Sequence, residues 1–339
     1  MQELQNAARW LAEQGKTPEI AQSIFFGGGT PSLLPVPLLG QITDALWENF
    51  SVAQDAEVTL EANPETVNRE FCRALQSFTP INRISLGAQS FRPENLAKLE
   101  RLGSRESIEN AASCLKEEGF RNFSLDLIFG IPGQSERDSL EDIELAAALE
   151  PQHLSFYNLT LKPAHTLYRS LPSADSAAEL YEAGIHRLKE LGYTRYEISN
   201  FSREDQQSRH NLLYWDGGDY LGVGPSAASR FFWDGTFHHR KQYSDLGKYL
   251  AAQGFPIPAF EKITHSQTVL EAAFLELRKV SGVDLATFES RYAYDLKQAR
   301  KFPLFLKEGL LIHEDGKLKL TDRGLLLADS VTEELVDLG

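Results

Sequence analysis

The stretch SIFFGGGTPSLLP, Ser23–Pro35, places three consecutive glycines directly after a short apolar run. The composition of Ser23–Phe26, apolar with β-branched and aromatic residues, is typical of a short buried strand. Gly27–Gly29 lack a Cβ, so a ligand can approach the backbone closely and meet exposed N–H donors. A simple strand-ending turn explains the same residues equally well, because short glycine motifs recur by chance.

Four further apolar runs repeat this pattern along the first half of the chain. They are EVTLEAN (residues 57–63), RISLGAQS (83–90), NFSLDLIFG (122–130) and HLSFYNLT (153–160). Amphipathic helical patterns separate consecutive runs. Repeated strand–helix alternation predicts right-handed βαβ crossovers and a parallel sheet. Near-continuous apolar strands favour a sheet that is covered on both faces or closed into a barrel. The sequence therefore predicts a barrel-like α/β fold.

Polar residues stand at or just after the ends of these five runs. They are the loop Gly27–Thr30, Glu61, Gln89, Asp126 and Thr160. A lone carboxylate at a strand end is usually satisfied by local hydrogen bonds. Ligands of parallel α/β folds collect where the carboxyl ends of the strands open, and five polar groups at that edge predict a site for a polar small molecule.

Composition excludes several classes of function. The chain has 339 residues and a net charge of −14, and an acidic surface repels phosphate backbones, so no nucleic-acid partner is expected. No apolar run approaches the roughly 18–20 residues of a membrane span. Residues 1–15 have the pattern of a polar amphipathic helix and not of a secretory signal, which predicts a cytoplasmic protein.

The two cysteines, Cys72 and Cys114, lie 42 positions apart in helix-like stretches, and we expect buried single thiols. In the last part of the chain, three helical stretches (265–280, 284–293 and 296–309) precede a hairpin pattern with an Asp–Gly turn (310–324). This order resembles a winged-helix module, for which the acidic charge favours a packing or docking role.

The motifs together resemble one family. They are FFGGGTPSLL (25–34), LEANPE (60–65), ISLGAQSF (84–91), LDLIFGIPGQ (125–134) and YEISNF (196–201). They are similar to radical S-adenosylmethionine proteins related to oxygen-independent coproporphyrinogen oxidase. RHNLLYWDGGDYLGVG (209–224) resembles the haem-chaperone branch, HemW. The resemblance implies a three-quarter TIM-like parallel barrel with the haem motif in residues 1–225, and a helical, winged-helix-like domain in residues 226–339.

The resemblance also implies how S-adenosylmethionine is held. Backbone N–H groups of Gly28 and Gly29, with Thr30, would meet the methionyl carboxylate. Glu61 would hold the ammonium group, and Asp126 would suit the ribose hydroxyls. The remaining positions that match the family are Gln89, Arg101 and Thr160.

The haem motif supplies His210, whose neutral imidazole can ligate haem iron, with Asn211, Tyr214 and Trp215 beside it. Residue type alone favours a surface histidine before an aromatic core patch, and the resemblance to the haem-chaperone motif reverses this preference. Ala228 stands where the family usually has a histidine, so any role of that histidine is lost here.

The family begins with a strand and a C-x-x-x-C-x-x-C loop that holds a 4Fe–4S cluster, and this sequence has neither. We therefore expect an N-terminally shortened member that lacks the first barrel strand and the cluster, and whether it is an enzyme stays open. The expected function is a haem chaperone that binds haem and S-adenosylmethionine for delivery to an unknown acceptor protein. The alternatives are an oxygen-independent coproporphyrinogen III oxidase and a catalytically silent scaffold that docks a partner.

Overall fold

The computed structural model describes residues 1–14, 20–252 and 255–336, which form two compact units. The first, here called the barrel unit, contains Gln22–Asp44 and Val52–His210. The second unit contains Met1–Ala21, Ala45–Ser51 and Asn211–Gly339. The division predicted between residues 225 and 226 stays a prediction.

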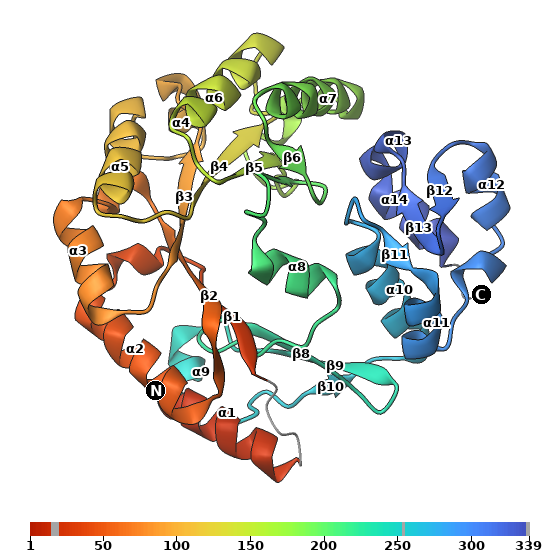
Figure 1. The fold of residues 1–339 in the computed structure, drawn as a ribbon, viewed down its shortest axis with the longest axis horizontal. Helices are drawn as coiled ribbons and strands as arrows, with labels where there is room; N and C mark the ends of the chain where they lie inside the picture. The colour runs from red at the N-terminus through yellow and green to blue at the C-terminus, as the bar shows by residue number, and fades with distance from the viewer. Residues whose placement is uncertain (15–19, 253–254, 337–339) are drawn as a thin grey trace. The chain divides into compact units, whose positions relative to one another are not determined.

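A seven-stranded sheet in the order β1-β2-β3-β4-β5-β7-β6 forms the barrel unit (Figure 1). Its strands are β1 (Ala21–Phe26), β2 (Val52–Ala62), β3 (Arg83–Gln89), β4 (Phe123–Phe129), β5 (His153–Asn158), β6 (Thr194–Arg195) and β7 (Asn200–Ser202). Strands β2 to β5 pair in parallel, and β7 joins β5 in the antiparallel sense. The five predicted strands and the predicted partial-barrel α/β fold are confirmed. The short β6–β7 pair, which contains part of the YEISNF motif, was not predicted as strand.

Helices follow the parallel strands in sequence and lie along the outer side of the curved sheet in Figure 1. They are α2 (Val36–Asn49), α3 (Arg69–Phe78), α4 (Pro93–Lys98), α5 (Arg105–Glu117), α6 (Glu136–Ala148) and α7 (Ala174–Glu190). Side chains alternate between the two faces of a strand. In β3, for example, Ile84 and Leu86 are fully buried apolar residues, whereas Arg83 and Ser85 belong to the opposite, polar face. The sheet therefore has an apolar face for packing and a polar face for chemistry.

Cys72 on α3 is buried, and Cys114 on α5 is partly buried; both are free thiols. Burial raises the pKa of the Cys72 thiol to about 12, with smaller contributions from Cys114 and Glu118. A thiol with that pKa is protonated at neutral pH, which suits the predicted structural role.

In the second unit, α1 (Gln2–Glu13) contacts a sheet of β8 (Ala228–Trp233), β9 (Thr236–Lys241) and β10 (Glu261–Lys262). Trp10 stacks on Phe260 at 5.0 Å between ring centroids and meets Phe255 edge-on. The helices α8 (Arg209–Trp215) and α9 (Leu246–Ala251) precede β10 along the chain.

The last part of the chain contains the predicted helices and hairpin. Its elements are α10 (His265–Glu276), β11 (Val283–Asp284), α11 (Leu285–Tyr292), α12 (Phe302–Lys307), β12 (Leu311–Glu314), β13 (Lys317–Leu320), α13 (Asp322–Leu326) and α14 (Ala328–Leu335). Strands β12 and β13 pair antiparallel, and Asp315 and Gly316 between them have φ of 51° and 75°. Positive φ at both central residues is the geometry of a two-residue hairpin turn, as the Asp–Gly pair predicted.

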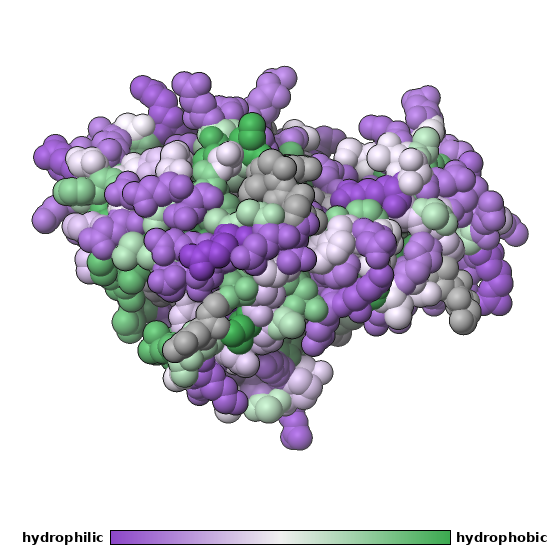
Figure 2. Space-filling view, turned by 90° about the horizontal axis from the view of Figure 1, so that it is seen from below, coloured by the Kyte–Doolittle hydropathy of each residue, from purple (hydrophilic) through white to green (hydrophobic). Residues whose placement is uncertain are grey.

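Hydrophilic residues cover most of the face drawn in Figure 2, with hydrophobic residues in smaller patches between them. Within the described residues, no helix combines the length and the apolar character that crossing a membrane requires.

A buried ion pair joins Glu3 on α1 to Arg240 on β9 in the second unit and makes a testable contribution to stability. Burial by itself raises the pKa of Glu3, but hydrogen bonds from Arg240, Gln242, Gly224 and Tyr249 outweigh this effect, so the pKa is lowered. The Arg240 side chain is fully buried. We expect Glu3→Gln to cost roughly 2–4 kcal/mol, because Arg240 keeps its charge and loses its counter-ion.

The pH dependence of this effect follows from its sign. A lowered pKa in the folded state stabilises the fold above the unfolded pKa, near 4.5, and this stability is lost as the pH falls through the folded pKa. Urea unfolding between pH 4 and pH 7, followed by tryptophan fluorescence, measures it. Glu13→Gln, at an exposed position of the same helix, is the control. Equal stability of Glu3→Gln and the control at pH 7 would contradict the assignment.

Candidate functional site

A cavity of about 190 Å³ lies at the carboxyl ends of the first strands of the barrel unit. We call it the rim cavity. Its lining residues are Gly29, Thr30, Pro31, Glu61, Ala62, Asn63, Ser85, Gly87, Gln89, Arg101 and Asp126. This is the edge at which ligands of parallel α/β sheets bind.

The glycine loop after β1 forms one wall of the rim cavity. Gly28 and Gly29 have φ of +82° and +62°, and a Cβ added to either would meet nothing within 4 Å. The loop therefore presents open backbone in a conformation that glycine adopts most easily. The Gly28 N–H donates to Glu61 Oε2 at 2.9 Å, which ties the loop to the end of β2.

Gly27 is glycine for a different reason. A Cβ at this position would lie 2.6 Å from Phe25 Cε1 and 3.1 Å from Glu61 Cδ. The Phe25 ring and the Glu61 carboxyl thus occupy the space that any side chain at Gly27 would need.

The end of β3 is irregular, and this places Gln89 in the rim cavity. The β3–β4 register shifts between Leu86 and Gln89, and Gln89 has a φ of 63°. The Gln89 side chain folds back over Gly87, where a Cβ would lie 2.7 Å from Gln89 Nε2. Arg101 reaches the same place from the segment after α4, with Nη1 3.5 Å from Asn63 Oδ1.

Asp126 on β4 supplies the deepest carboxyl of the rim cavity. It accepts a hydrogen bond from Ser85 Oγ at 3.1 Å, and Ser124 Oγ donates to Ser85 Oγ at 2.9 Å. Burial raises the pKa of Asp126, hydrogen bonds from Ser155 and Ser85 oppose the rise, and the nearby Glu61 charge adds to it.

Most of the residues predicted for S-adenosylmethionine meet in this cavity. Gly29, Thr30, Glu61, Gln89, Arg101 and Asp126 line it. Gly28 is not part of the lining, but its N–H donates a hydrogen bond to Glu61, which is. Thr160 is outside the lining, on an exposed segment after β5, where its hydroxyl donates to Asn158 O at 3.4 Å. Their role in binding stays a prediction.

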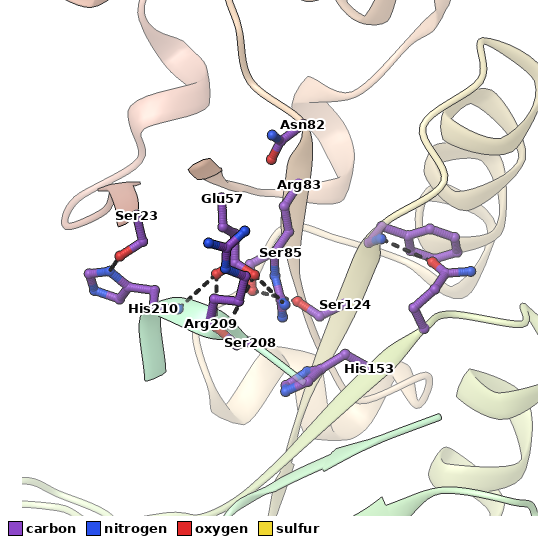
Figure 3. Close-up of polar contacts among 12 residues, drawn as sticks. Ser23, Glu57, Asn82, Arg83, Ser85, Ser124, His153, Ser208, Arg209 and His210 are labelled. Carbon is purple, nitrogen blue, oxygen red and sulfur yellow. Dashed lines mark hydrogen bonds and ion pairs between the residues drawn. The ribbon is translucent and has the colours of Figure 1, made fainter. Parts of the chain in front are cut away.

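A second polar cluster, the Glu57 cluster, lies on the same face of the barrel unit (Figure 3). Glu57 is buried on β2, and its carboxylate accepts from Ser208 Oγ at 3.2 Å and from the backbone N–H groups of Arg209 and His210 at 3.0 Å each. The guanidinium of Arg83 on β3, also buried, lies 3.5 Å from the same carboxylate. Glu57 therefore receives the first N–H groups of α8 and fixes where that helix begins.

His210 is held by two residues of β1. Its Nδ1 lies 3.0 Å from Ser23 Oγ, and its ring stacks on Phe25 at 4.9 Å between centroids with planes 22° apart. Burial lowers the pKa of His210 and Arg83 lowers it further, whereas the charge of Glu57 opposes the shift. The imidazole is therefore neutral at pH 7.

Asn211, Tyr214 and Trp215 follow His210 on α8 and belong to the second unit. Tyr214 is exposed, and its ring meets Trp215 at 5.0 Å and Tyr220 at 5.3 Å. The guanidinium of Arg278 lies 4.9 Å from the Trp215 ring centroid.

The donor sets of the two clusters fit two kinds of group. The rim cavity combines glycine backbone with carboxylates, amides and an arginine, which suits a zwitterionic, hydroxyl-bearing ligand. His210 offers a neutral imidazole of the kind that ligates haem iron. A 4Fe–4S cluster needs several thiolates, whereas the sequence contains only Cys72 and Cys114, on two helices outside the site. Within the described part of the chain, no three His, Cys, Asp or Glu side chains are grouped to hold a metal ion.

Sequence reasoning missed Glu57, Arg83, Ser23 and Phe25. One signal was present for Glu57: it stands four residues before Glu61 in one strand, so both side chains share a face. The partners of Glu57 come about 150 positions later, and no local pattern announces them.

The fold and the two polar clusters define a class of protein. Residues 3–146 match the Radical SAM superfamily, and residues 263–327 match the HemN C-terminal domain. The solved structure of coproporphyrinogen III oxidase (HemN) from Escherichia coli superposes with a TM-score of 0.78, over 99% of this chain and 82% of that chain. At 22% sequence identity, this likeness shows the fold alone.

Relatives of higher identity define the family. The heme chaperone HemW of Mycobacterium tuberculosis is 34% identical over 97% of this chain and 86% of its own length. The HemW of Bacillus subtilis is 32% identical over 95% of this chain and 86% of its own length. The chain belongs to the HemW family.

Two alanine substitutions in the glycine loop distinguish the cost of a steric clash from the cost of a positive φ. We expect Gly27→Ala to cost about 1–3 kcal/mol, because its Cβ forces Phe25 or Glu61 to move. Gly28→Ala has open space and a positive φ, so it should cost only about 1 kcal/mol. Urea unfolding of the whole chain compares the two variants. If Gly27→Ala unfolds at the urea concentration of the unmodified chain, Phe25 does not pack as described.

Proposed function

We propose that this chain is a haem carrier: it binds haem through His210, binds S-adenosylmethionine in the rim cavity, and delivers haem to an acceptor protein. Two observations support the proposal. Relatives named heme chaperone HemW align with 97% and 95% of this chain. The geometry adds a neutral histidine whose Nδ1 is engaged by Ser23. The proposal depends mainly on this second observation, the environment of His210.

Haem binding depends on the protonation state of His210. A protonated imidazole cannot ligate iron, and the lowered pKa of His210 keeps the ring neutral down to a more acidic pH than an ordinary histidine. Tyr214 and Trp215 on the same helix bring large, flat, partly apolar side chains of the kind that pack against a porphyrin.

Binding of S-adenosylmethionine depends on matching charges in the rim cavity. Glu61 would bind the ammonium group, Arg101 the carboxylate and Asp126 the ribose hydroxyls. The cavity, at about 190 Å³, is smaller than the roughly 300–1,000 Å³ of typical ligand pockets, so part of the cofactor would extend beyond it.

The radical SAM family implies a 4Fe–4S cluster, and we infer that these 339 residues alone do not hold one, because they include two cysteines. We therefore assign binding and delivery of haem to this chain. The coproporphyrinogen oxidase alternative has the shared fold and the match to the HemN C-terminal domain in its favour, and it is not better supported than the haem chaperone. A cytoplasmic location stays a prediction.

Haem titration tests the first part of the proposal. We expect His210→Ala to abolish or shift the haem absorbance band, because the ligating nitrogen is removed. His186→Ala, an exposed histidine on α7, is the control and should leave the band unchanged. An unchanged spectrum of His210→Ala at full haem occupancy would show that another side chain ligates the iron.

Calorimetric titration with S-adenosylmethionine tests the second part. Asp126→Asn and Glu61→Gln should each weaken binding about 10-fold or more, since hydrogen bonds to charged groups contribute about 1.5–3 kcal/mol. Binding to the unmodified chain should also weaken as the pH falls through the raised pKa of Asp126, earlier than for an ordinary aspartate. Glu70→Gln, exposed on α3, is the control. Unchanged affinity of both site variants would place the cofactor elsewhere.

A further inference from the structure

Ser23 and Phe25 lie on one face of β1, two residues apart, and both contact His210. The stacked Phe25 ring restricts tilting of the imidazole, and the Ser23 hydroxyl meets one of its two nitrogens. In a neutral imidazole one nitrogen carries the proton and the other carries the lone pair. The hydrogen bond of one nitrogen decides which of them is free to ligate a metal.

Glu57 acts on the backbone that carries the same ring. Its two carboxylate oxygens receive the N–H groups of Arg209 and His210, at 3.0 Å each, and so fix the first turn of α8. Arg209 adds two anchors, from Nη1 to Asp55 on β2 at 3.1 Å and from Nη2 to Gln22 on β1 at 3.3 Å. The backbone of His210 is therefore held mainly by β2, with one further anchor on β1, and the rotation of its ring is set by Ser23 and Phe25 of β1.

We propose that Ser23 and Glu57 are positioning residues for iron ligation by His210, and that Nε2 is the nitrogen that binds the iron. The inference rests on the haem-binding function proposed above. With Nε2 as the ligand, Nδ1 carries the ring proton, and the Nδ1–H group donates a hydrogen bond to Ser23 Oγ. No proton is released and no covalent bond is broken. In this role Glu57 and Ser23 would act through His210, by their contacts with its backbone and its ring, and not as ligands of the iron.

Residues that hydrogen-bond a metal-ligating histidine typically change metal affinity 10–100-fold when they are removed. We therefore expect Ser23→Ala to weaken ferric haem binding about 10-fold and to shift the haem absorbance band, because Nδ1–H loses its acceptor. Ser23→Thr keeps the hydroxyl and should restore both the affinity and the spectrum. Ser170→Ala, an exposed serine, is the matched control.

Glu57→Gln should have a similar effect on haem, but it also leaves buried Arg83 without its counter-ion, so the fold of this variant can suffer. The Ser23 series keeps the inference testable in that case. Thermal unfolding of each variant shows whether loss of haem affinity accompanies loss of the fold. Glu70→Gln controls for the change in charge.

A chemical-rescue experiment separates ring positioning from general stability. In His210→Gly, added imidazole replaces the missing ring together with its single N–H group, whereas 1-methylimidazole supplies a ligating nitrogen but has no N–H group. If Ser23 Oγ accepts a hydrogen bond from the ring N–H group, imidazole should restore haem ligation at a several-fold lower concentration than 1-methylimidazole. The difference should shrink when Ser23→Ala is combined with His210→Gly.

The outcomes distinguish this inference from the proposed function. If His210→Ala alters the haem spectrum and Ser23→Ala binds haem as tightly as the unmodified chain with the same spectrum, the positioning role is overturned and haem ligation by His210 stands. If His210→Ala leaves the spectrum unchanged, the proposed ligand fails and the positioning role fails with it. Weaker binding by Ser23→Ala, with recovery by Ser23→Thr, supports the inference.

Discussion

A buried carboxylate on the second strand, Glu57, determines where α8 begins. Taking an ion out of water costs several kcal/mol unless charges and hydrogen bonds replace the water. Here Arg83 supplies the opposite charge, and Ser208, Arg209 and His210 supply three donors. These donors lie about 150 positions later in the sequence, so the compensation exists only when α8 starts on the sheet (Figure 3). The first turn of the haem motif and the burial of Glu57 therefore depend on each other.

Strand alternation connects this cluster with the rim cavity. On β1, Ser23 and Phe25 share one face and Gly27 follows the end of the strand, and on β2 Glu57 and Glu61 share one face. At about 3.3 Å per residue, Glu57 and Glu61 are roughly 13 Å apart along the strand. Phe25 stacks on His210 and also occupies the space beside Gly27, so a single ring contacts both regions.

The site residues at the carboxyl edge of the sheet could be predicted from the sequence, whereas the polar contacts within the sheet could not. Glu61, Gln89 and Asp126 were predicted to meet because parallel strands end at one edge, and they do line one cavity. Thr160 followed the same rule and lies outside that lining, because the segment after β5 is exposed and leads away from the parallel strands. Glu57 and Ser23 escaped notice because their partners come from a segment far along the chain. The strands also appeared more continuously apolar than they are, because polar residues alternate with apolar ones: Arg83 and Ser85 on β3, Ser124 and Asp126 on β4, and His153 and Ser155 on β5.

The same alternation assigns successive residues of each strand to two faces, one that packs in the core and one that carries the polar clusters. On β2 and β3 the even-numbered positions, such as Leu60, Ile84 and Leu86, are buried apolar residues that pack under the helices. The odd-numbered positions carry Glu57, Glu61, Arg83 and Ser85. On β4 the parity is reversed, because the register pairs Ser85 with Ser124 and Leu86 with Leu125.

Not all polar groups on the polar face have a hydrogen-bond partner: Thr59 Oγ1 and His153 Nδ1 are buried with none among the described residues. Buried polar groups of this kind weaken a fold and persist where the face serves another purpose. We therefore expect truncation of a side chain on the apolar face to change stability first, and an isosteric change on the polar face to spare stability only where, unlike at Glu57, no buried charge loses its counter-ion.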